Sequence, residues 1–578
     1  MDHTAADHRA LCCNYQHGSP CTKVASLACK SCLMVAYCNK RCQAAHWPTH
    51  RKDCQSPIMK GTWKPRWAAE NRLPAFVLGG IWDQVLFGVV KYLWGNVPAF
   101  DVIQLGQNEG VSFQDPMNLL FAVVNLPQSY RSPLNIVIND NEIDIVARNL
   151  IFLLIMLIEE DPNKAAESML HVWYSALVTE SCYNLLQKLK PLVEDVCSKI
   201  AEKPYQTLHG ETWEFRGNSL RLILTREAWM KLPSYFSVRA GMTKETTQAI
   251  RQAVVNAPSR VDYVDRAVML QSPTMGLGMV KYRSDGILVP FGQAREAFTV
   301  PNPTFFGASN QWPMMDSADP TNGWSIKTFL ATKAGPAKKD TYGQLHYYLK
   351  HLFVHFHHYL RTKPVSFELH QIDAKVLNKT LAGREFDRIE VSNICDSAYL
   401  GITTTLETFG PLLRGRSANP HATLITAFLN AVHEIKMEER KKRLIAALND
   451  ATLDTEIAWK YIDFEAPTGT RAEKEERILN NFIKISSAEK LVSDMDKYFN
   501  WYMNKYRFAR AASYAGVEMK EKHTIIPPWP LRFNGGLYPT QKDKEDFKLL
   551  LGSGHAGHER YVEWKVADAQ RGGFCRPS

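Results

Sequence analysis

The sequence predicts a small metal-bound module joined to an α/β domain, which is built on a parallel sheet and carries many additional helices. Eight of the twelve cysteines lie before residue 55, and the other four are scattered over the remaining chain. From about Trp94 onward, short apolar strands alternate with polar turns and helices, the pattern of a parallel sheet covered by helices. Residues 168–363 and the chain after residue 436 have mostly helical patterning.

The composition is that of a globular protein with several domains. The chain has 578 residues, of which 45% are hydrophobic and 22% charged, and its net charge of +10 is mild for this length. Nucleic acid is therefore not favoured as a partner. The first ten residues lack the apolar segment of a signal peptide, and the apolar run before Glu159 is too short to cross a bilayer. We expect a cytoplasmic or nuclear protein without a membrane partner, whose clustered cysteines bind metal.

The cysteine-rich stretch has the spacing of zinc ligands. Its six candidate ligands are Cys29, Cys32, Cys38, Cys42, His50 and Cys54. The first two form a C-x2-C pair, and the other four make two pairs whose members are four residues apart, which suits one face of a helix. Two tetrahedral zinc ions need eight ligands, so two more must come from upstream. The upstream candidates are Cys12, Cys13 and Cys21; Cys21 is the firm member, and spacing does not choose between the other two.

The motif C-x2-C, AYC, x3, CQ, HW, x2, H, x3, C closely resembles the MYND zinc finger over residues 12–54. The resemblance implies two interleaved structural zinc sites. One would use Cys12, Cys21, Cys38 and Cys42, and the other Cys29, Cys32, His50 and Cys54. Cys12 is preferred to Cys13 because fungal members begin with a Cys-Ala-Asn that aligns with residues 12–14. The family also implies a shallow groove for proline-containing peptides, associated here with Gln43 and Trp47.

The α/β region has two candidate cofactor-binding turns. An apolar strand is predicted over residues 100–105, followed by a turn that contains Gly106 and Gly110, and then by a helix. A second strand over residues 135–138 ends at the acidic turn of Asp140. Ligands of such sheets bind at the carboxyl ends of the strands, where glycines admit the ligand and an acidic residue can bind a ribose. The alternatives are an ordinary strand-to-helix turn and a helix N-cap at Asp140.

S-adenosylmethionine (SAM) methyltransferases carry an acidic residue and a G-x-G-x-G turn at the first strand, and this chain departs from both. Gln104 stands at the acidic position and Asn108 at the middle glycine. A further strand within residues 386–396 would be the fourth strand of such a sheet, whose end faces the substrate. Ser392, Asn393 and Asp396 are the polar residues there.

The segments "WGNVPAFDVIQLGQNEG" and "NDNEIDIVARNLIFLL" resemble the fungal domain of unknown function that occurs beside MYND fingers. That domain is similar to the N-terminal domain of the axonemal dynein-arm assembly factors. The resemblance implies a Rossmann-like, methyltransferase-like fold, without implying activity.

The predicted organisation has seven parts. They are a disordered tail over residues 1–11, a MYND finger over 12–54, a linker over 55–76, the first part of the Rossmann-like domain over 77–167, a mostly helical insertion over 168–363, the second part of that domain over 364–436, and a helical region over 437–578.

The remaining motifs do not predict a specific site. His351 and His355 are four residues apart but lack the following glutamate of a zinc protease, and the glycines at 276 and 278 are not followed by the lysine of a phosphate-binding loop. His555 and His558 are expected on a disordered surface.

The functional prediction is a zinc-binding interaction or regulatory protein, whose MYND finger recruits a partner through a proline-containing peptide and whose methyltransferase-like domain is a catalytically degenerate scaffold. No catalytic residue is assigned. The alternatives are an active SAM-dependent methyltransferase, with SAM at Gly106, Gly110 and Asp140, and a DNA-binding transcription regulator.

Overall fold

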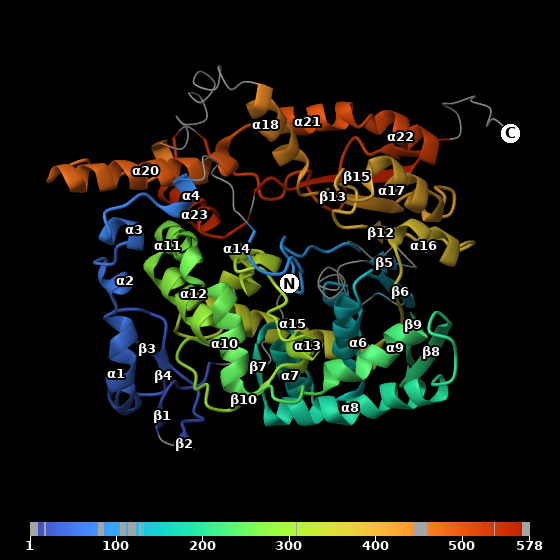
Figure 1. The fold of residues 1–578 in the computed structure, drawn as a ribbon, viewed down its shortest axis with the longest axis horizontal. Helices are drawn as coiled ribbons and strands as arrows, with labels where there is room; N and C mark the ends of the chain where they lie inside the picture. Colours follow the sequence, from blue (N-terminus) through green and yellow to red (C-terminus); the bar gives the residue numbers. More distant parts are fainter. Residues whose placement is uncertain are drawn as a thin grey trace.

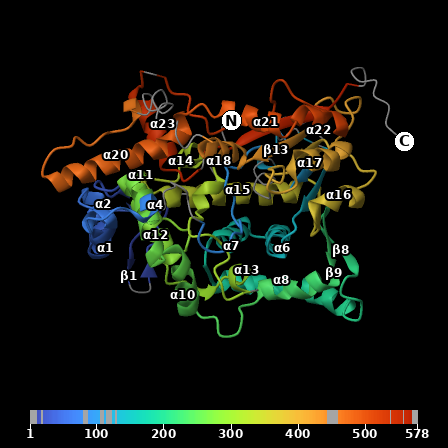
Figure 2. The same ribbon diagram turned by 45° about the horizontal axis from the view of Figure 1, so that its top comes forward.

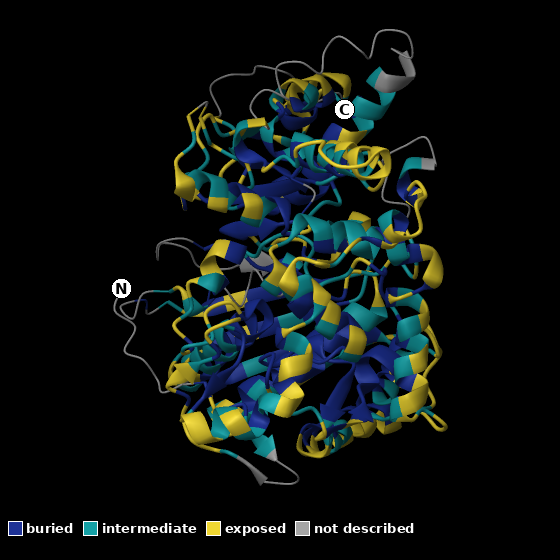
Figure 3. Ribbon diagram, turned by 90° about the vertical axis from the view of Figure 1, so that its left-hand side faces the viewer, coloured by how far each residue is buried: buried dark blue, intermediate teal, exposed yellow. Residues whose placement is uncertain are grey.

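The computed structural model describes residues 10–16, 19–78, 86–103, 111–113, 123–126, 130, 132–307, 309–442, 459–536, 538–555 and 557–568. Figures 1 and 2 show the small N-terminal module at one end of the molecule, opposite strands β8 and β9. Buried residues fill the interior beneath a layer of half-buried and exposed ones (Figure 3). Within the described residues, the helices are too short or too polar to cross a membrane.

The N-terminal module consists of two short hairpins and a helix. Strand β1 (Tyr15–Gln16) pairs with β2 (Ser19–Pro20), and β3 (Leu27–Ala28) pairs with β4 (Ala36–Tyr37), both antiparallel. Helix α1 (Lys40–Cys54) begins at Asn39, whose side chain accepts a hydrogen bond from the backbone N–H of Cys42. This cap places the first turn of α1 directly after β4.

The linker folds into three one-turn helices that dock onto the rest of the chain. They are α2 (Pro57–Lys60), α3 (Arg66–Ala69) and α4 (Ala75–Leu78). Trp67 is fully buried, with its ring edge-on to that of Phe76. The guanidinium of Arg72 donates to both carboxylate oxygens of Asp262, at 2.6 and 2.8 Å. The connector is therefore anchored by both apolar and charged contacts.

A nine-stranded mixed sheet organises the remainder. Its spatial order is β14, β15, β13, β12, β5, β6, β11, β9, β8. The six strands from β13 to β9 run parallel, whereas β15 and β8 are antiparallel to their neighbours. The strands are β5 (Val111–Phe113), β6 (Leu134–Asn139), β8 (Leu208–Phe215), β9 (Asn218–Thr225), β11 (Val365–His370), β12 (Arg388–Glu390), β13 (Thr423–Phe428), β14 (Val517–Met519) and β15 (Arg560–Val566). A separate pair joins β7 (Leu177–Thr179) to β10 (Phe298–Pro301).

Helices cover the sheet and fill the space between it and the N-terminal module (Figure 1). From α6 to α15 they are α6 (Ile143–Ile158), α7 (Pro162–Tyr174), α8 (Glu180–Lys199), α9 (Arg226–Lys231), α10 (Lys244–Val255), α11 (Val261–Leu270), α12 (Pro273–Asp285), α13 (Pro303–Phe306), α14 (Ile326–Leu330) and α15 (Thr341–Thr362). The later ones are α16 (Ala374–Thr380), α17 (Gly401–Phe409), α18 (Ala431–Lys442), α20 (Arg471–Val492), α21 (Asp496–Lys505), α22 (Phe508–Ala515) and α23 (Gln541–Leu551).

Helix α6 lies at the centre of the main core, as its apolar sequence predicts. It is buried along almost its whole length, and even Arg148 on it is only 1% exposed. The Arg148 guanidinium is satisfied by the carbonyl of Trp173, at 2.8 Å, and by the hydroxyl of Thr304. These hydrogen bonds make the burial of a cation tolerable.

The strand predicted over residues 100–105 is wrong for the part of it that the structure describes. Residues 100–103 form no strand, and the carbonyl of Ile103 instead accepts a hydrogen bond from Arg388. The first strand, β5, begins at Val111, directly after Gly110, so it follows the glycine segment instead of preceding it. The predicted insertion over residues 168–363 also extends the sheet, since its β9 pairs with β11.

Candidate metal centre

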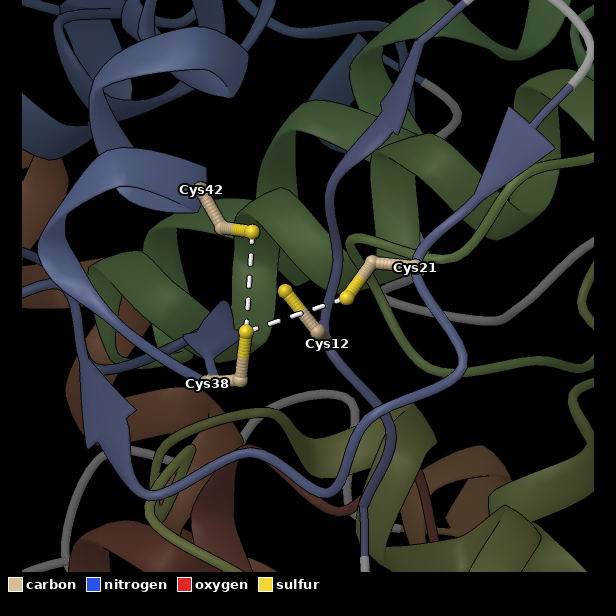
Figure 4. Close-up of side chains that lie close together, drawn as sticks. All are labelled: Cys12, Cys21, Cys38 and Cys42. Atoms are coloured by element: carbon tan, nitrogen blue, oxygen red, sulfur yellow. Dashed lines mark hydrogen bonds between the residues drawn. The ribbon is translucent and has the colours of Figure 1, made fainter.

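The first group of ligands brings together four thiols from four parts of the finger. They are Cys12, Cys21, Cys38 and Cys42, whose sulfur atoms all lie within 4.8 Å of one another. Figure 4 shows these sulfurs pointing toward one another. Sγ of Cys38 is 3.7 Å from that of Cys21 and 3.5 Å from that of Cys42. The backbone N–H of Lys23 bonds to Cys21 and lowers its thiol pKa, which favours the thiolate that zinc requires.

The second group combines a tight turn with the last turn of α1. Its members are Cys29, Cys32, His50 and Cys54, all buried and within the same 4.8 Å limit. Sγ of Cys29 lies 3.8 Å from Sγ of Cys54, and Sγ of Cys32 lies 3.4 Å from Nε2 of His50. The backbone N–H of Met34 donates to Cys32 and supports its orientation.

Both groups fit a structural zinc ion. A tetrahedral ion with Zn–S bonds of about 2.3 Å separates its sulfur ligands by about 3.8 Å, and a sulfur from a nitrogen by about 3.5 Å. The distances in both groups are close to these values. The first group offers four thiolates, and the second offers three thiolates and one imidazole. Each set fills four coordination positions with protein atoms, so neither site has room for a substrate.

Helix α1 links the two sites. Cys42 in its first turn belongs to the first group, and His50 and Cys54 at its end belong to the second. The second group also places the single histidine ligand beside the edge of the Trp47 ring, with ring centroids 5.8 Å apart. Loss of either site would therefore release one end of the helix.

Cys13 lies outside both groups. It is buried, and its sulfur accepts a hydrogen bond from the backbone N–H of Ala36 at 3.4 Å. Burial raises the pKa of its thiol to about 12, which disfavours the thiolate. The geometry thus places Cys12, and not Cys13, beside Cys21.

Gln43 and Trp47 lie four residues apart on α1 and therefore share one face of the helix. Both side chains are half-buried, and that of Trp47 packs against the apolar residues of the finger. Nδ1 of His46, which is buried, lies 3.0 Å from the hydroxyl of Tyr37, inside the finger. Gln43 and Trp47 are less buried than His46, so part of each residue stays accessible.

The finger shares its apolar core with the rest of the chain. Leu277 of α12 and Phe291 pack within the same cluster as the finger cysteines. The backbone N–H of Ala10 donates to the carbonyl of Ala334 at 2.9 Å. No sequence motif predicts these contacts, because the residues that make them are ordinary apolar residues more than 200 positions away from the finger.

Of the three predicted cofactor residues, the structure describes only Asp140. Gly106 and Gly110, with Gln104 and Asn108, lie outside the described residues. Asp140 follows β6 and accepts a hydrogen bond from the backbone N–H of Glu142 at 2.7 Å, while burial raises its pKa to about 6. It is not the N-cap of α6, because the helix begins after Glu142.

After β12, the predicted site residue Asp396 also makes hydrogen bonds within the protein. Asp396 is buried, and its carboxylate accepts hydrogen bonds from the backbone N–H groups of Leu429 and Asn430, both at 3.0 Å. Ser392 adopts a left-handed backbone conformation with φ of 48°. Asp396 therefore joins the ends of two strands and does not face open space.

The remaining histidines form no further metal cluster among the described residues. His346 is buried beside the carbonyl of Leu288, 3.2 Å from its Nδ1. His555, expected on a disordered surface, is instead buried, with Nε2 2.8 Å from the carbonyl of Asn322.

Comparison with known proteins gives two family matches. Residues 13–54 match the MYND finger, and residues 93–178 match a domain of unknown function (DUF4470). No curated protein and no solved structure matches the chain. The MYND match begins at Cys13, one residue after the cysteine that the geometry places in the first group. The chain thus carries a zinc-binding MYND finger at its N-terminus, followed by a DUF4470 domain.

Proposed function

We propose that the protein is a zinc-dependent interaction or regulatory protein, whose MYND finger recruits partners through proline-containing peptides. The observation that carries this proposal is the pair of closed four-ligand sites, which serve structure and leave no position for chemistry. MYND fingers mediate protein–protein interaction, and Gln43 and Trp47 provide a half-buried polar and aromatic pair on one face of α1. An aromatic ring beside an amide suits a proline-containing segment, which is already extended and loses little entropy on binding.

The proposal can be tested with the full zinc-loaded chain and a fluorescent pool of nonapeptides with Pro-Pro fixed at the centre. We expect binding that is weakened at least about tenfold by Trp47→Ala or Gln43→Ala. Arg51→Ala, an exposed change on the same helix, should leave it unchanged. Wild-type protein that holds zinc and binds no member of the pool would refute peptide recruitment.

The finer division of the chain belongs to the same proposal. We take residues 77–167 and 364–436 as two parts of one methyltransferase-like scaffold, interrupted by residues 168–363 and followed by a helical region. Numbering β5, β6, β11, β12, β13 and β14 from one to six gives the order 3-2-1-4-5-6, with β15 inserted between the last two. This is the order of doubly wound dinucleotide-binding sheets, and it supports the similarity to the dynein-arm assembly factors.

The same strand order favours a second candidate function, a SAM-dependent methyltransferase. Its ligand would bind at the carboxyl ends of β5 and β12, where the strand order reverses, near Asp140. Titration calorimetry with SAM, together with a thermal shift, distinguishes the two functions. Binding that is lost in Asp140→Asn would support an enzyme. The scaffold proposal predicts neither heat nor a shift in Tm.

A further inference from the structure

A cavity of about 420 Å³ lies between the finger and the segment that leads into α15. The finger contributes Ala10, Leu11 and Met34, and the rest of the chain contributes Leu330, Ala331 and Tyr347, among others. The finger residues that line it all precede α1. The cavity is therefore separate from the face of Gln43 and Trp47, and it exists only while the finger is docked.

Gln344, one of the residues that line the cavity, has a buried hydrogen-bond acceptor without a partner among the described residues. The residue is only 7% exposed. Its Nε2 donates to the carbonyl of Lys338 at 2.8 Å, which fixes the orientation of the amide, and its Oε1 has no hydrogen-bond partner in the described part of the chain. A buried acceptor without a partner costs about 1–3 kcal/mol, and a ligand that brings an N–H or O–H group would recover this.

The acidic side chain that lines the cavity already has hydrogen-bond partners for both of its carboxylate oxygens. Asp340 is buried, and its two carboxylate oxygens accept hydrogen bonds from the backbone N–H groups of Phe291 and Gly343, at 2.7 and 2.8 Å. It therefore has no need of a cationic ligand. Among the described side chains that line the cavity, the buried polar atom without a partner is Oε1 of the uncharged Gln344 amide.

The rim of the cavity is basic and partly apolar. Lys333 and Lys338 are exposed and line it, and within the described part of the chain neither ammonium group has an ion-pair partner. Leu11, which is 53% exposed, lies on the same rim and bridges to Val24, which is 43% exposed. An apolar interior under a cationic rim attracts a ligand with an apolar centre and negative flanks.

We propose that this cavity binds a short acidic segment of a partner protein, in which a bulky apolar side chain is flanked by Asp or Glu. The apolar side chain would fill the interior, a backbone N–H beside it would donate to Oε1 of Gln344, and the flanking carboxylates would pair with Lys333 and Lys338. A peptide combines these three features over a few residues. This site goes beyond the finger's own groove, because most of its lining residues come from outside the finger.

The test uses the full zinc-loaded chain and the fluorescent probe Ac-Glu-Asp-Glu-Leu-Phe-Glu-Asp. Binding should weaken at least about tenfold when Leu-Phe is replaced by Ala-Ala, or when the acidic residues are replaced by lysine. It should weaken similarly in Ala331→Trp, which blocks the cavity, and in the double variant Lys333→Glu/Lys338→Glu. The charge-matched control Lys60→Glu/Lys522→Glu, at two exposed lysines elsewhere, should bind as the wild type does.

The zinc content and the Tm of each variant report whether it folds. If Ala331→Trp does not fold, the test relies on the double lysine variant. Trp47→Ala should leave this probe unaffected, so failure of the proline-peptide proposal and failure of this one give different results. A wild-type Kd weaker than about 1 mM, or equal binding by Ala331→Trp and wild type, would overturn the site. If dodecanoate binds and the probe does not, the ligand is a small amphipathic carboxylate and not a peptide, and the proposal is refuted.

Discussion

The sulfur of Cys13 lies directly over Gly292, so closely that a Cβ at that glycine would come within 2.6 Å of it. The same Cβ would be 2.8 Å from Cγ1 of Val35. Both neighbours belong to the finger, whereas Gly292 belongs to the larger part of the chain. The two parts therefore meet at a position where even one methyl group does not fit.

Gly292→Ala should destabilise this junction by about 1–3 kcal/mol, because the added methyl group overpacks it. The expected result is a lower Tm and a lower midpoint of urea unfolding. Gly415→Ala is the matched control, since a Cβ there meets no atom of the described residues within 4 Å. Equal stability of the two variants would mean that the finger does not dock on Gly292.

Cys12→Ser and Cys13→Ser should differ in zinc content. Removal of a ligand opens the first site, so Cys12→Ser should retain about one zinc ion per chain, whereas Cys13→Ser should retain both. Elemental analysis of the purified proteins measures this directly. The opposite result would make Cys13 the ligand and would agree with the start of the MYND match.

Removal of zinc should affect more than the finger. Residues 10–54 lose their fold without the metal, and Leu277 and Phe291 then lose the apolar surface on which they pack. After treatment with a strong chelator, hydrogen exchange should speed up in the finger and also in α12. Helix α22, which packs against α17 and β14, serves as the internal control. Faster exchange confined to residues 10–54 would contradict a shared core.

Glu368 should make the stability of the sheet depend on pH. Nε2 of His370 and Nη1 of Arg384 each lie 2.7 Å from its Oε1, and they lower its pKa from 4.5 to about 2, the contact with His370 contributing most. A lowered pKa stabilises the fold above about pH 4.5, and this contribution is lost as the pH falls toward 2.

Glu368→Gln should therefore cost about 1–3 kcal/mol at pH 7, measured by urea unfolding, and progressively less as the pH falls below 4.5. Glu202→Gln, at an exposed position, is the control and should leave the free energy of unfolding unchanged both at pH 7 and below pH 4.5. A penalty for Glu368→Gln that stays constant with pH would show that the carboxylate charge is not its cause.

The finger could be predicted in detail because all of its metal ligands lie close together in the sequence. The eight residues brought together fall within residues 12–54, and their spacing reflects a knuckle and the turns of one helix. Spacing alone does not choose between Cys12 and Cys13, since adjacent residues have the same spacing to within one position, and the preference for Cys12 came from the family resemblance. In the structure, the Cys12 sulfur lies with the other three thiols, whereas Ala36 and Gly292 pack around Cys13.

The sheet was harder to predict because its strands are placed by distant partners. Residues 100–105 are as apolar as a strand, yet Ile103 is bonded by Arg388 instead of by a neighbouring strand. The second strand, β6, was predicted to within one residue at either end, since its apolar run is bounded by Pro133 and the polar turn after Asn139. Nothing in β8 and β9 indicates that this hairpin joins the edge of the same sheet.

The long insertion between β6 and β11 has a consequence for synthesis of the chain. Asn139 and Ile372, which are bonded across the ends of these strands, are separated by 233 residues. At a translation rate of about 5–20 residues per second, the edge of β6 waits roughly 10–50 s on the ribosome for its partner. The finger, by contrast, has all its ligands within the first 54 residues and can close around zinc long before the sheet is complete.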